Sequence, residues 1–299
     1  MSAAWRELPG RVLTARRADG HRVLYLVAAA AFVVAAIVGW IALPDLDQDP
    51  RWWLIGVGLV LAAPLTAVVN GAEYAVTARL VGYRVRPAEA TRIAVLASAA
   101  NLLPLPGAVA VRAQALRRRG ATTTRAVWAT AIAGAVWVGV ALGAAGALQL
   151  GGDHRSTALA ATVTGIVVVV ASGVAAWALT RSLPLGPVLA LVMVEVASVA
   201  VGAGRYLLVL LALGFDVDAR QAIALAVAGI LASLVGILPG GLGVRELLAG
   251  AIAPLVGLAA AVGVIGSAVD RLIGLPALAV MALVASARPP RDEPQQSPQ

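Results

Sequence analysis

The stretch GILPGGLGVRE, residues 236–246, interrupts a long apolar segment of the chain. It places one proline, four glycines and an adjacent arginine and glutamate where a membrane helix would otherwise continue. Pro239 has no amide hydrogen and ends an incoming helix, whereas Gly240, Gly241 and Gly243 permit positive φ angles and a close approach of other groups. The stretch therefore predicts a helix, a broken turn and a second helix inside apolar sequence.

The composition of the chain is that of a membrane protein. Of its 299 residues, 61% are hydrophobic and 13% are charged, and the mean hydropathy is +0.90. The net charge is +8, but all 23 basic residues are arginines and most flank apolar runs. That distribution suits membrane orientation and lipid contact, so we expect no nucleic-acid partner. Because cysteine is absent and both histidines fall in predicted loops, we expect neither a metal nor a cofactor.

Hydropathy predicts an all-α polytopic membrane protein with six full spans and two re-entrant helical hairpins. Six apolar runs are long enough to cross a hydrocarbon core of about 30 Å; they lie near 23–43, 52–80, 126–150, 157–180, 187–213 and 260–286. Residues 88–118 and 220–258 are instead broken by proline and glycine, and irregular backbone at membrane depth is tolerated only inside protein or beside a wet cavity. We assign residues 1–287 to a single transmembrane domain.

The arginines predict the orientation of the chain. If both hairpins return to the side from which they start, 17 arginines flank the inner side and three flank the outer side. This excess predicts a multi-pass protein of the cell membrane with cytoplasmic N- and C-termini. Residues 1–22 would then form a basic cytoplasmic segment, and the polar, proline-rich residues 288–299 a disordered cytoplasmic tail.

The two hairpin regions resemble each other in sequence. LVGYRV at 80–85 corresponds to LALGFDV at 211–217, which places Gly82 opposite Gly214. The distance along the sequence from Arg112 to Arg245 is one residue longer than the distance from Gly82 to Gly214. The prolines that precede the two arginines, Pro106 and Pro239, have the same separation as the arginines. Three predicted crossings separate the hairpins, so the second would enter from the opposite face, as in the inverted repeats of transporters. Chance similarity between two apolar segments is the alternative.

The hairpins also predict an anion-binding site. A helix that begins near Val244 would point its free N–H groups and positive dipole end into the membrane interior, and Arg245 adds a charge in its first turn. This arrangement favours a phosphate, and Glu246 would orient an arginine. Arg112 is the counterpart in the first hairpin, whose bend contains Asn101, Pro104, Pro106 and Gly107.

Other charged residues lie inside predicted membrane segments, where each costs about 2.5–3.5 kcal/mol and so faces a partner, a cavity or a substrate. They are Glu73, Glu195, Arg205, Asp270 and Arg271. We expect Arg271 to assist phosphate binding and the acidic residues to pair with arginines or to carry coupling protons. Glu195 and Arg205 are about 15 Å apart along a helix and cannot pair with each other. For any one residue the alternative is a purely structural role.

Small residues recur at helical spacing in two spans. Gly263, Ser267, Asp270 and Gly274 form one small and polar stripe that faces the bundle interior. The pair of glycines four residues apart at 139 and 143 is interpreted as a helix-packing surface.

Three motifs resemble the flippase-like membrane domain of lysylphosphatidylglycerol synthases. They are Asn101-Leu-Leu-Pro104 with Arg112, Leu238-Pro239-Gly-Gly-Leu-Gly-Val-Arg245-Glu246, and Ala268-Val-Asp-Arg271. The resemblance covers roughly residues 20–287 and implies a stand-alone domain that moves a charged or glycosylated lipid between leaflets. The chain differs from the family pattern in having Ala108-Val109 where a Gly-Glu usually precedes the arginine of the first hairpin, Arg112. It also shows no aminoacyl-transfer domain, so we do not expect lysyl transfer.

The leading hypothesis is a flippase, not an enzyme, for an anionic phospholipid or a polyprenyl-phosphate-linked lipid, acting by alternating access. Its partners would be the lipid, the bilayer and a membrane glycosyltransferase or another lipid-modifying enzyme. The second hypothesis is an integral-membrane enzyme acting on a lipid phosphate, with Asp45, Asp47 and Asp49 as its only candidate acidic cluster. The third is a non-transporting partner subunit of such an enzyme.

Overall fold

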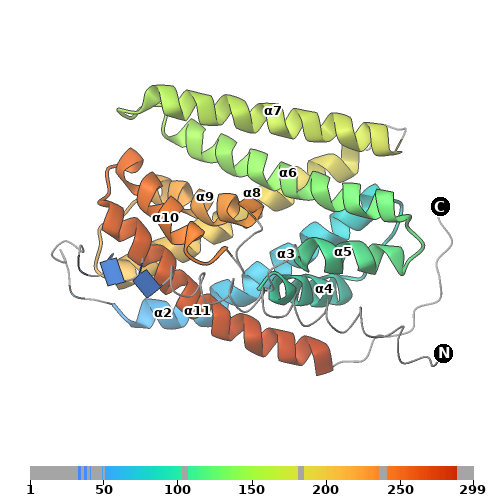
Figure 1. Ribbon diagram of the computed structural model, residues 1–299, viewed down its shortest axis with the longest axis horizontal. Coiled ribbons are helices and arrows are strands. Elements are labelled where there is room, and N and C mark those ends of the chain that lie inside the picture. The colour runs from blue at the N-terminus through green and yellow to red at the C-terminus, as the bar shows by residue number, and fades with distance from the viewer. Residues whose placement is uncertain are drawn as a thin grey trace, which may run out of the picture.

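The computed structural model describes residues 51–102, 107–180, 185–235 and 241–287, together with positions 33, 34, 37, 38, 41 and 49. These residues form an all-helical protein (Figure 1). The predicted span 23–43 lies almost entirely outside the described residues, and the segments 1–22 and 288–299 lie wholly outside them. The same holds for Pro104, Pro106, Pro239 and Gly240.

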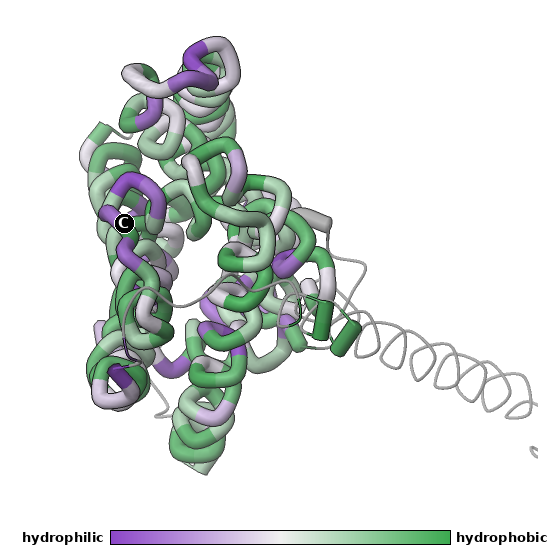
Figure 2. Tube along the Cα trace, turned by 90° about the vertical axis from the view of Figure 1, so that its left-hand side faces the viewer, coloured by the Kyte–Doolittle hydropathy of each residue, from purple (hydrophilic) through white to green (hydrophobic). Residues whose placement is uncertain are grey.

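Five helices of the described chain are long and apolar enough to cross a membrane, which indicates a multi-pass membrane protein. Each differs from its predicted apolar run by no more than three residues at either end. The first is built from α2 (Trp53–Val57), the π-helical turn η1 (Gly58–Ala62) and α3 (Ala63–Leu80); the others are α6 (Thr123–Leu148), α7 (Arg155–Thr180), α8 (Leu185–Ala212) and α11 (Ala260–Ala287). Hydrophobic residues cover most of their length (Figure 2).

Each predicted hairpin region contains two shorter helices that pack against each other. The first region forms α4 (Pro87–Ala100) and α5 (Gly107–Arg117). The second forms α9 (Ala219–Val235), α10 (Val244–Ile252) and the 3₁₀ turn η3 (Ala253–Val256). Both regions therefore contain the two helices that were predicted for them, on either side of residues that lie outside the described part of the chain.

The turns that lead into the two hairpins have the same backbone geometry. Gly82 and Gly214 adopt φ angles of +89° and +88°, a region that favours glycine. Tyr83 N donates to Ala78 O at 3.0 Å, and Phe215 N donates to Leu210 O at 3.0 Å. The interval from Gly82 to Gly214, here called the repeat interval, also separates these two hydrogen bonds and the first residues of α4 and α9.

The buried cores repeat at the same interval. One core joins α3, α4, α5 and α6, and another joins α8, α9, α10 and α11. Several residues of the first core have a counterpart in the second core one repeat interval later; the pairs are Tyr74 and Tyr206, Ala78 and Leu210, Val81 and Leu213, Val85 and Val217, Ala90 and Ala222, and Ile93 and Leu225. The chain therefore contains two units of similar construction.

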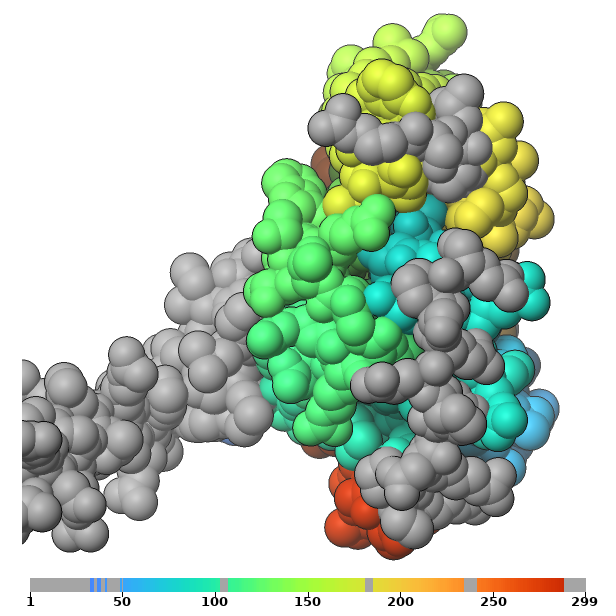
Figure 3. Space-filling model, turned by 90° about the vertical axis from the view of Figure 1, so that its right-hand side faces the viewer, coloured from blue at the N-terminus to red at the C-terminus, as the bar shows by residue number. Residues whose placement is uncertain are grey.

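Helices of each unit pack against helices of the other unit. The helix α4 of the first unit contacts α11 of the second, α9 of the second contacts α6 of the first, and α3 lies against α8. The face in Figure 3 brings together the start of α6 in green, the end of α7 with the start of α8 in yellow, and the end of α11 in red. Arg117 lies in the last turn of α5, and Arg125 lies in the first turn of α6.

The helices α6 and α7 lie side by side (Figure 1) because glycines allow a close approach. A Cβ atom at Gly165 would lie 2.4 Å from Gly143 N and 2.5 Å from Gly139 O. Such distances exclude any side chain at Gly165 without a shift of one helix. The predicted small-residue pair of α6 is thus part of a helix–helix contact.

Candidate functional site

A cavity of about 220 Å³ lies between the two units. Its walls come from α3 and α4 of the first unit and from α8, α10 and α11 of the second. The polar side chains that line it are those of Thr66, Asn70, Ser98, Asn101, Arg205, Arg245 and Arg271. Among the described residues, no acidic side chain is part of this wall. The cavity surface is therefore rich in hydrogen-bond donors and in positive charge.

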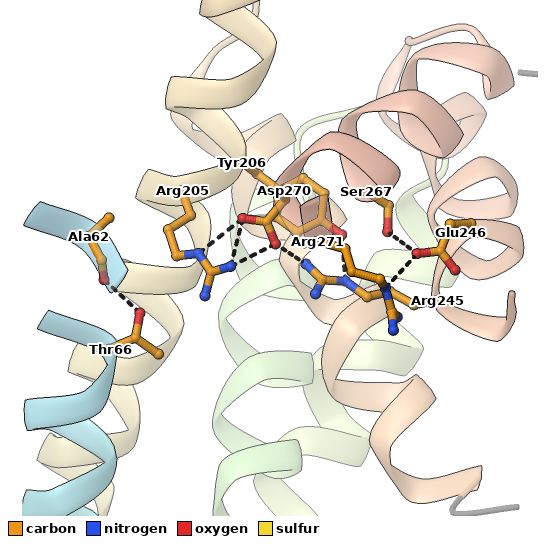
Figure 4. A network of polar contacts seen from close by, with 9 residues as sticks. All are labelled: Ala62, Thr66, Arg205, Tyr206, Arg245, Glu246, Ser267, Asp270 and Arg271. Carbon is orange, nitrogen blue, oxygen red and sulfur yellow. Dashed lines mark hydrogen bonds and ion pairs between the residues drawn. The ribbon is translucent and has the colours of Figure 1, made fainter. Parts of the chain in front are cut away.

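Two of the arginines share one carboxylate (Figure 4). Arg205 donates to Asp270 through Nε at 2.9 Å and through Nη2 at 3.0 Å. Arg245 donates through Nη2 to Asp270 Oδ2, and through Nε to the Tyr206 hydroxyl at 3.2 Å. The Arg245 guanidinium also lies over the Tyr206 ring, 5.3 Å from its centre, which adds a cation–π contact. These contacts fix both guanidinium groups beside the cavity.

The third arginine is held by Glu246. Arg271 Nε donates to Glu246 Oε1 at 3.0 Å, and the side chains are 5% and 0% exposed. The other oxygen of Glu246 accepts the backbone N–H of Gly243 at 2.8 Å, where φ is +80°. Arg271 Nη2 also donates to Gly241 O at 3.3 Å. The pair therefore fastens the tip of the second hairpin to α11.

These five residues, Arg205, Arg245, Arg271, Asp270 and Glu246, form the arginine cluster. It carries three positive and two negative formal charges, so one positive charge is in excess. The side chains of Arg205 and Arg245 are 21% and 20% exposed, whereas that of Asp270 is 3% exposed. The carboxylate is thus buried behind the guanidinium groups, and the positive groups face the open space.

A second group of buried charges, the acidic cluster, contains Glu73, Arg112 and Glu195. Arg112 makes a bidentate pair with Glu73, with Nη1 bonded to Oε1 and Nη2 to Oε2 at 2.9 Å. Glu195 is 1% exposed and its Oε1 has no hydrogen-bond partner in the described part of the chain. The excess charge of this cluster is negative when Glu195 is ionised.

The structure separates the predicted site residues into these two clusters. Asn101, Arg245 and Arg271 line the cavity together with Arg205, whereas Arg112 is paired with Glu73 and does not line it. Gly107 packs against Ala100, since a Cβ there would lie 2.1 Å from Ala100 O. Arg205 and Glu195 are not paired with each other, as their spacing on α8 requires.

Several site residues were not predicted from the sequence. Thr66 and Asn70 of α3 line the cavity, and Tyr206 contacts Arg245. Thr66, Asn70 and Glu73 are spaced by four and three residues, so they lie along one side of a helix. That polar stripe in an otherwise apolar span was a signal that could have identified them.

Within the described residues, no group of three or more histidine, cysteine, aspartate or glutamate side chains is arranged to hold a metal ion. Asp45 and Asp47 lie outside the described residues, and Asp49 is exposed. The chain matches no protein-family model, and no curated protein is significantly similar to it in sequence.

Proposed function

We propose that this protein is a lipid transporter that binds the phosphate of an anionic lipid in the cavity and moves it between leaflets. The observation that carries the proposal is the cavity wall, which is lined by three fixed arginines and two asparagines and, among the described residues, by no acidic side chain. Arginine offers a planar set of donors that matches phosphate oxygens. One excess positive charge of the cluster would be balanced by the bound headgroup.

The position of the cavity supports transport rather than storage of an anion. It lies between two units of similar construction, which is where transporters built from repeats bind their substrates. Relative motion of the units would change which side of the cavity is open. The resemblance of the hairpin motifs to the lysylphosphatidylglycerol synthase membrane domain agrees with a lipid cargo.

The size of the cavity favours a headgroup over a whole lipid. Its volume of about 220 Å³ is below the roughly 300–1,000 Å³ of sites that bury a drug-sized ligand. Part of the wall is apolar and includes Val95, Leu275, Leu278 and Met281. We infer that the phosphate lies at the arginines while the acyl or polyprenyl chain passes along this apolar wall into the bilayer.

The proposal includes six spans and two re-entrant hairpins that form an inverted repeat, in the cell membrane with both termini cytoplasmic. In support, α4 has 14 residues and α9 has 17, so at about 1.5 Å per residue they reach about 21 and 26 Å, less than a hydrocarbon core of about 30 Å. Arg117 at the end of α5 and Arg125 at the start of α6 flank the connection between these two helices, which agrees with a cytoplasmic position for it.

The test is a headgroup-accessibility assay in proteoliposomes with fluorescent anionic phospholipid or fluorescent polyprenyl phosphate. Wild type is compared with Arg245→Ala and with the matched control Arg220→Ala, whose side chain is 63% exposed and pairs with Asp218. Losing one charged hydrogen bond to the phosphate, about 1.5–3 kcal/mol, corresponds to a roughly tenfold or larger loss of rate. Arg220→Ala should keep the wild-type rate.

Each outcome bears on the proposal. Equal rates for wild type and folded Arg245→Ala, or a wild type no faster than protein-free liposomes, would contradict it. Transport of a zwitterionic lipid at the same rate would contradict phosphate recognition by excess positive charge. Thermal unfolding in detergent identifies any variant that fails to fold, and Arg205→Gln, which keeps a long polar side chain, then replaces Arg245→Ala.

A further inference from the structure

Four buried side-chain atoms have no hydrogen-bond partner in the part of the chain that the structure describes. They are Tyr74 Oη on α3, Arg112 Nε on α5, Trp137 Nε1 on α6 and Glu195 Oε1 on α8. The helix α6 contacts α3, α5 and α8, and α3 also contacts α8. Because buried polar atoms are nearly always hydrogen-bonded, the two of these atoms that belong to interacting residues, Arg112 Nε and Glu195 Oε1, mark a place where a further ligand or proton belongs.

The charges at this place leave Glu195 without a counter-ion of its own. Glu73 on α3 and Arg112 on α5 are the charged groups that act on it, and they neutralise each other in their bidentate pair. The remaining charged residue of α3, Arg79, lies in the last turn of that helix. A buried carboxylate without a dedicated cation is strongly unfavourable. Glu195 therefore needs a cation that its charged neighbours do not supply.

No other helix packed against α8 offers Glu195 a partner. The only ionisable side chains of α6 and α9, Arg125 and Arg220, lie in the first turns of those helices. Asp270 and Arg271 of α11, and Arg205 of α8 itself, belong to the arginine cluster. Since the described residues also lack a set of three ligands for a metal ion, a proton is the cation that fits a single carboxyl group.

The internal repeat relates this place to the cavity. Glu195 lies one repeat interval after Ala63, which lines the cavity wall. When the first residues of α6 and α11 are aligned, Trp137 corresponds to Gly274, another lining residue. The acidic cluster thus lies at the place that the repeat relates to the anion cavity.

We propose that Glu195 is a proton-binding residue whose protonation and deprotonation couple lipid movement to a proton gradient. This inference rests on the proposed transport function. A proton from one side binds the Glu195 carboxylate and is released to the other side when Arg112 Nε donates to Glu195 while its two Nη groups stay bonded to Glu73. Arg112 Nε, which has no partner in the described structure, is the group available for that exchange.

Two measurements on wild type, Glu195→Gln and the control Glu89→Gln test the inference. The Glu89 side chain is a third exposed and pairs with Arg119, so Glu89→Gln removes a carboxyl group that is accessible to water. Infrared difference spectra recorded during a pH change should show the carbonyl band of a buried protonated carboxyl in wild type and Glu89→Gln. The band should be lost in Glu195→Gln, which should melt at the wild-type temperature because glutamine mimics the protonated acid.

The second measurement adds a pH gradient to the proteoliposome assay. We expect the gradient to raise the wild-type and Glu89→Gln rates several-fold and to leave the Glu195→Gln rate unchanged. An unchanged infrared band in Glu195→Gln, or an unchanged response to the gradient, would overturn the inference. A wild type that moves no lipid would remove the coupling together with the transport function, whereas the infrared band would still decide whether Glu195 binds a proton.

Discussion

Replacing Glu246 by glutamine tests whether the buried pair with Arg271 holds the second hairpin in place. Glutamine keeps the shape and one oxygen of the side chain but removes the charge. At an effective dielectric constant of about 20, two charges 3.0 Å apart interact by about 5 kcal/mol. Removing one partner of a buried pair costs about 3–5 kcal/mol, since the other charge is left uncompensated. We therefore expect Glu246→Gln to lower the free energy of unfolding by about 3–5 kcal/mol.

The assay is denaturant unfolding in detergent, followed by circular dichroism, for Glu246→Gln, Arg271→Gln and the double variant. The double variant removes both charges, so its loss should be at least about 2 kcal/mol smaller than the sum of the single losses. Glu89→Gln is the control, because its more exposed pair with Arg119 should contribute only about 0–1 kcal/mol. Strict additivity, or a Glu246→Gln loss no larger than that of Glu89→Gln, would refute the reasoning.

Three further predictions follow from single contacts. Asp270→Asn should leave Arg205 and Arg245 without their shared carboxylate, so the melting temperature falls, and anionic phospholipid should then raise it more than it does for wild type; an equal rise would contradict a phosphate site. Gly165→Ala should destabilise by about 1–3 kcal/mol through overpacking against α6, whereas Gly173→Ala in the same helix meets nothing within 4 Å and should be neutral or slightly stabilising; equal effects would refute the close-contact argument. The Gln221 backbone N–H, which donates to Asp218 at 2.8 Å at the start of α9, lowers the pKa of Asp218, so its contribution is present above the ordinary aspartate pKa and is lost as pH falls through the lowered value. Asp218→Ala should therefore cost about 1 kcal/mol at pH 7 and progressively less below about pH 4, and a pH-independent difference would contradict the cap.

Hydropathy and turn chemistry were sufficient to predict the helices. Long apolar runs have few alternatives to a helix, and for this reason the five spans within the described residues were placed to within three residues. The positive φ angles of Gly82 and Gly214 were not predicted, although glycine suits these positions because few other residues adopt that conformation. The small and polar stripe of the last span was also predicted from local spacing, and two of its residues, Ser267 and Asp270, are buried.

The pairing of charges could not be predicted from sequence because it depends on how helices pack. Arg112 and Arg245 have similar places in the two hairpins, yet Arg112 bonds to Glu73 of α3 and Arg245 bonds to Asp270 of α11. The spacing between hairpins gave no information on which neighbouring helix supplies the acid. Thr66 and Asn70 form a readable polar stripe with Glu73, but the stripe alone does not show that its side of the helix faces a cavity.

The difference between the two pairings follows from one position of the repeat. Glu73 lies one repeat interval before Arg205, beside the matching tyrosines Tyr74 and Tyr206. In the first unit, Glu73 on α3 is the acid that pairs with the hairpin arginine, Arg112. In the second unit the same position is itself an arginine, so a third helix must bridge the two positive groups with Asp270.

This reversal of charge explains why two units of similar construction carry different clusters. The arginine cluster keeps one positive charge in excess beside an open cavity, whereas the hairpin arginine of the first unit is neutralised and lies near a buried acid, Glu195. Because α3 and α8 lie against each other, the relative motion of the units that the transport proposal requires would move both clusters at once. A lipid phosphate bound at the arginine cluster and a proton bound at the acidic cluster would then be released by the same motion, which is the requirement for coupled transport.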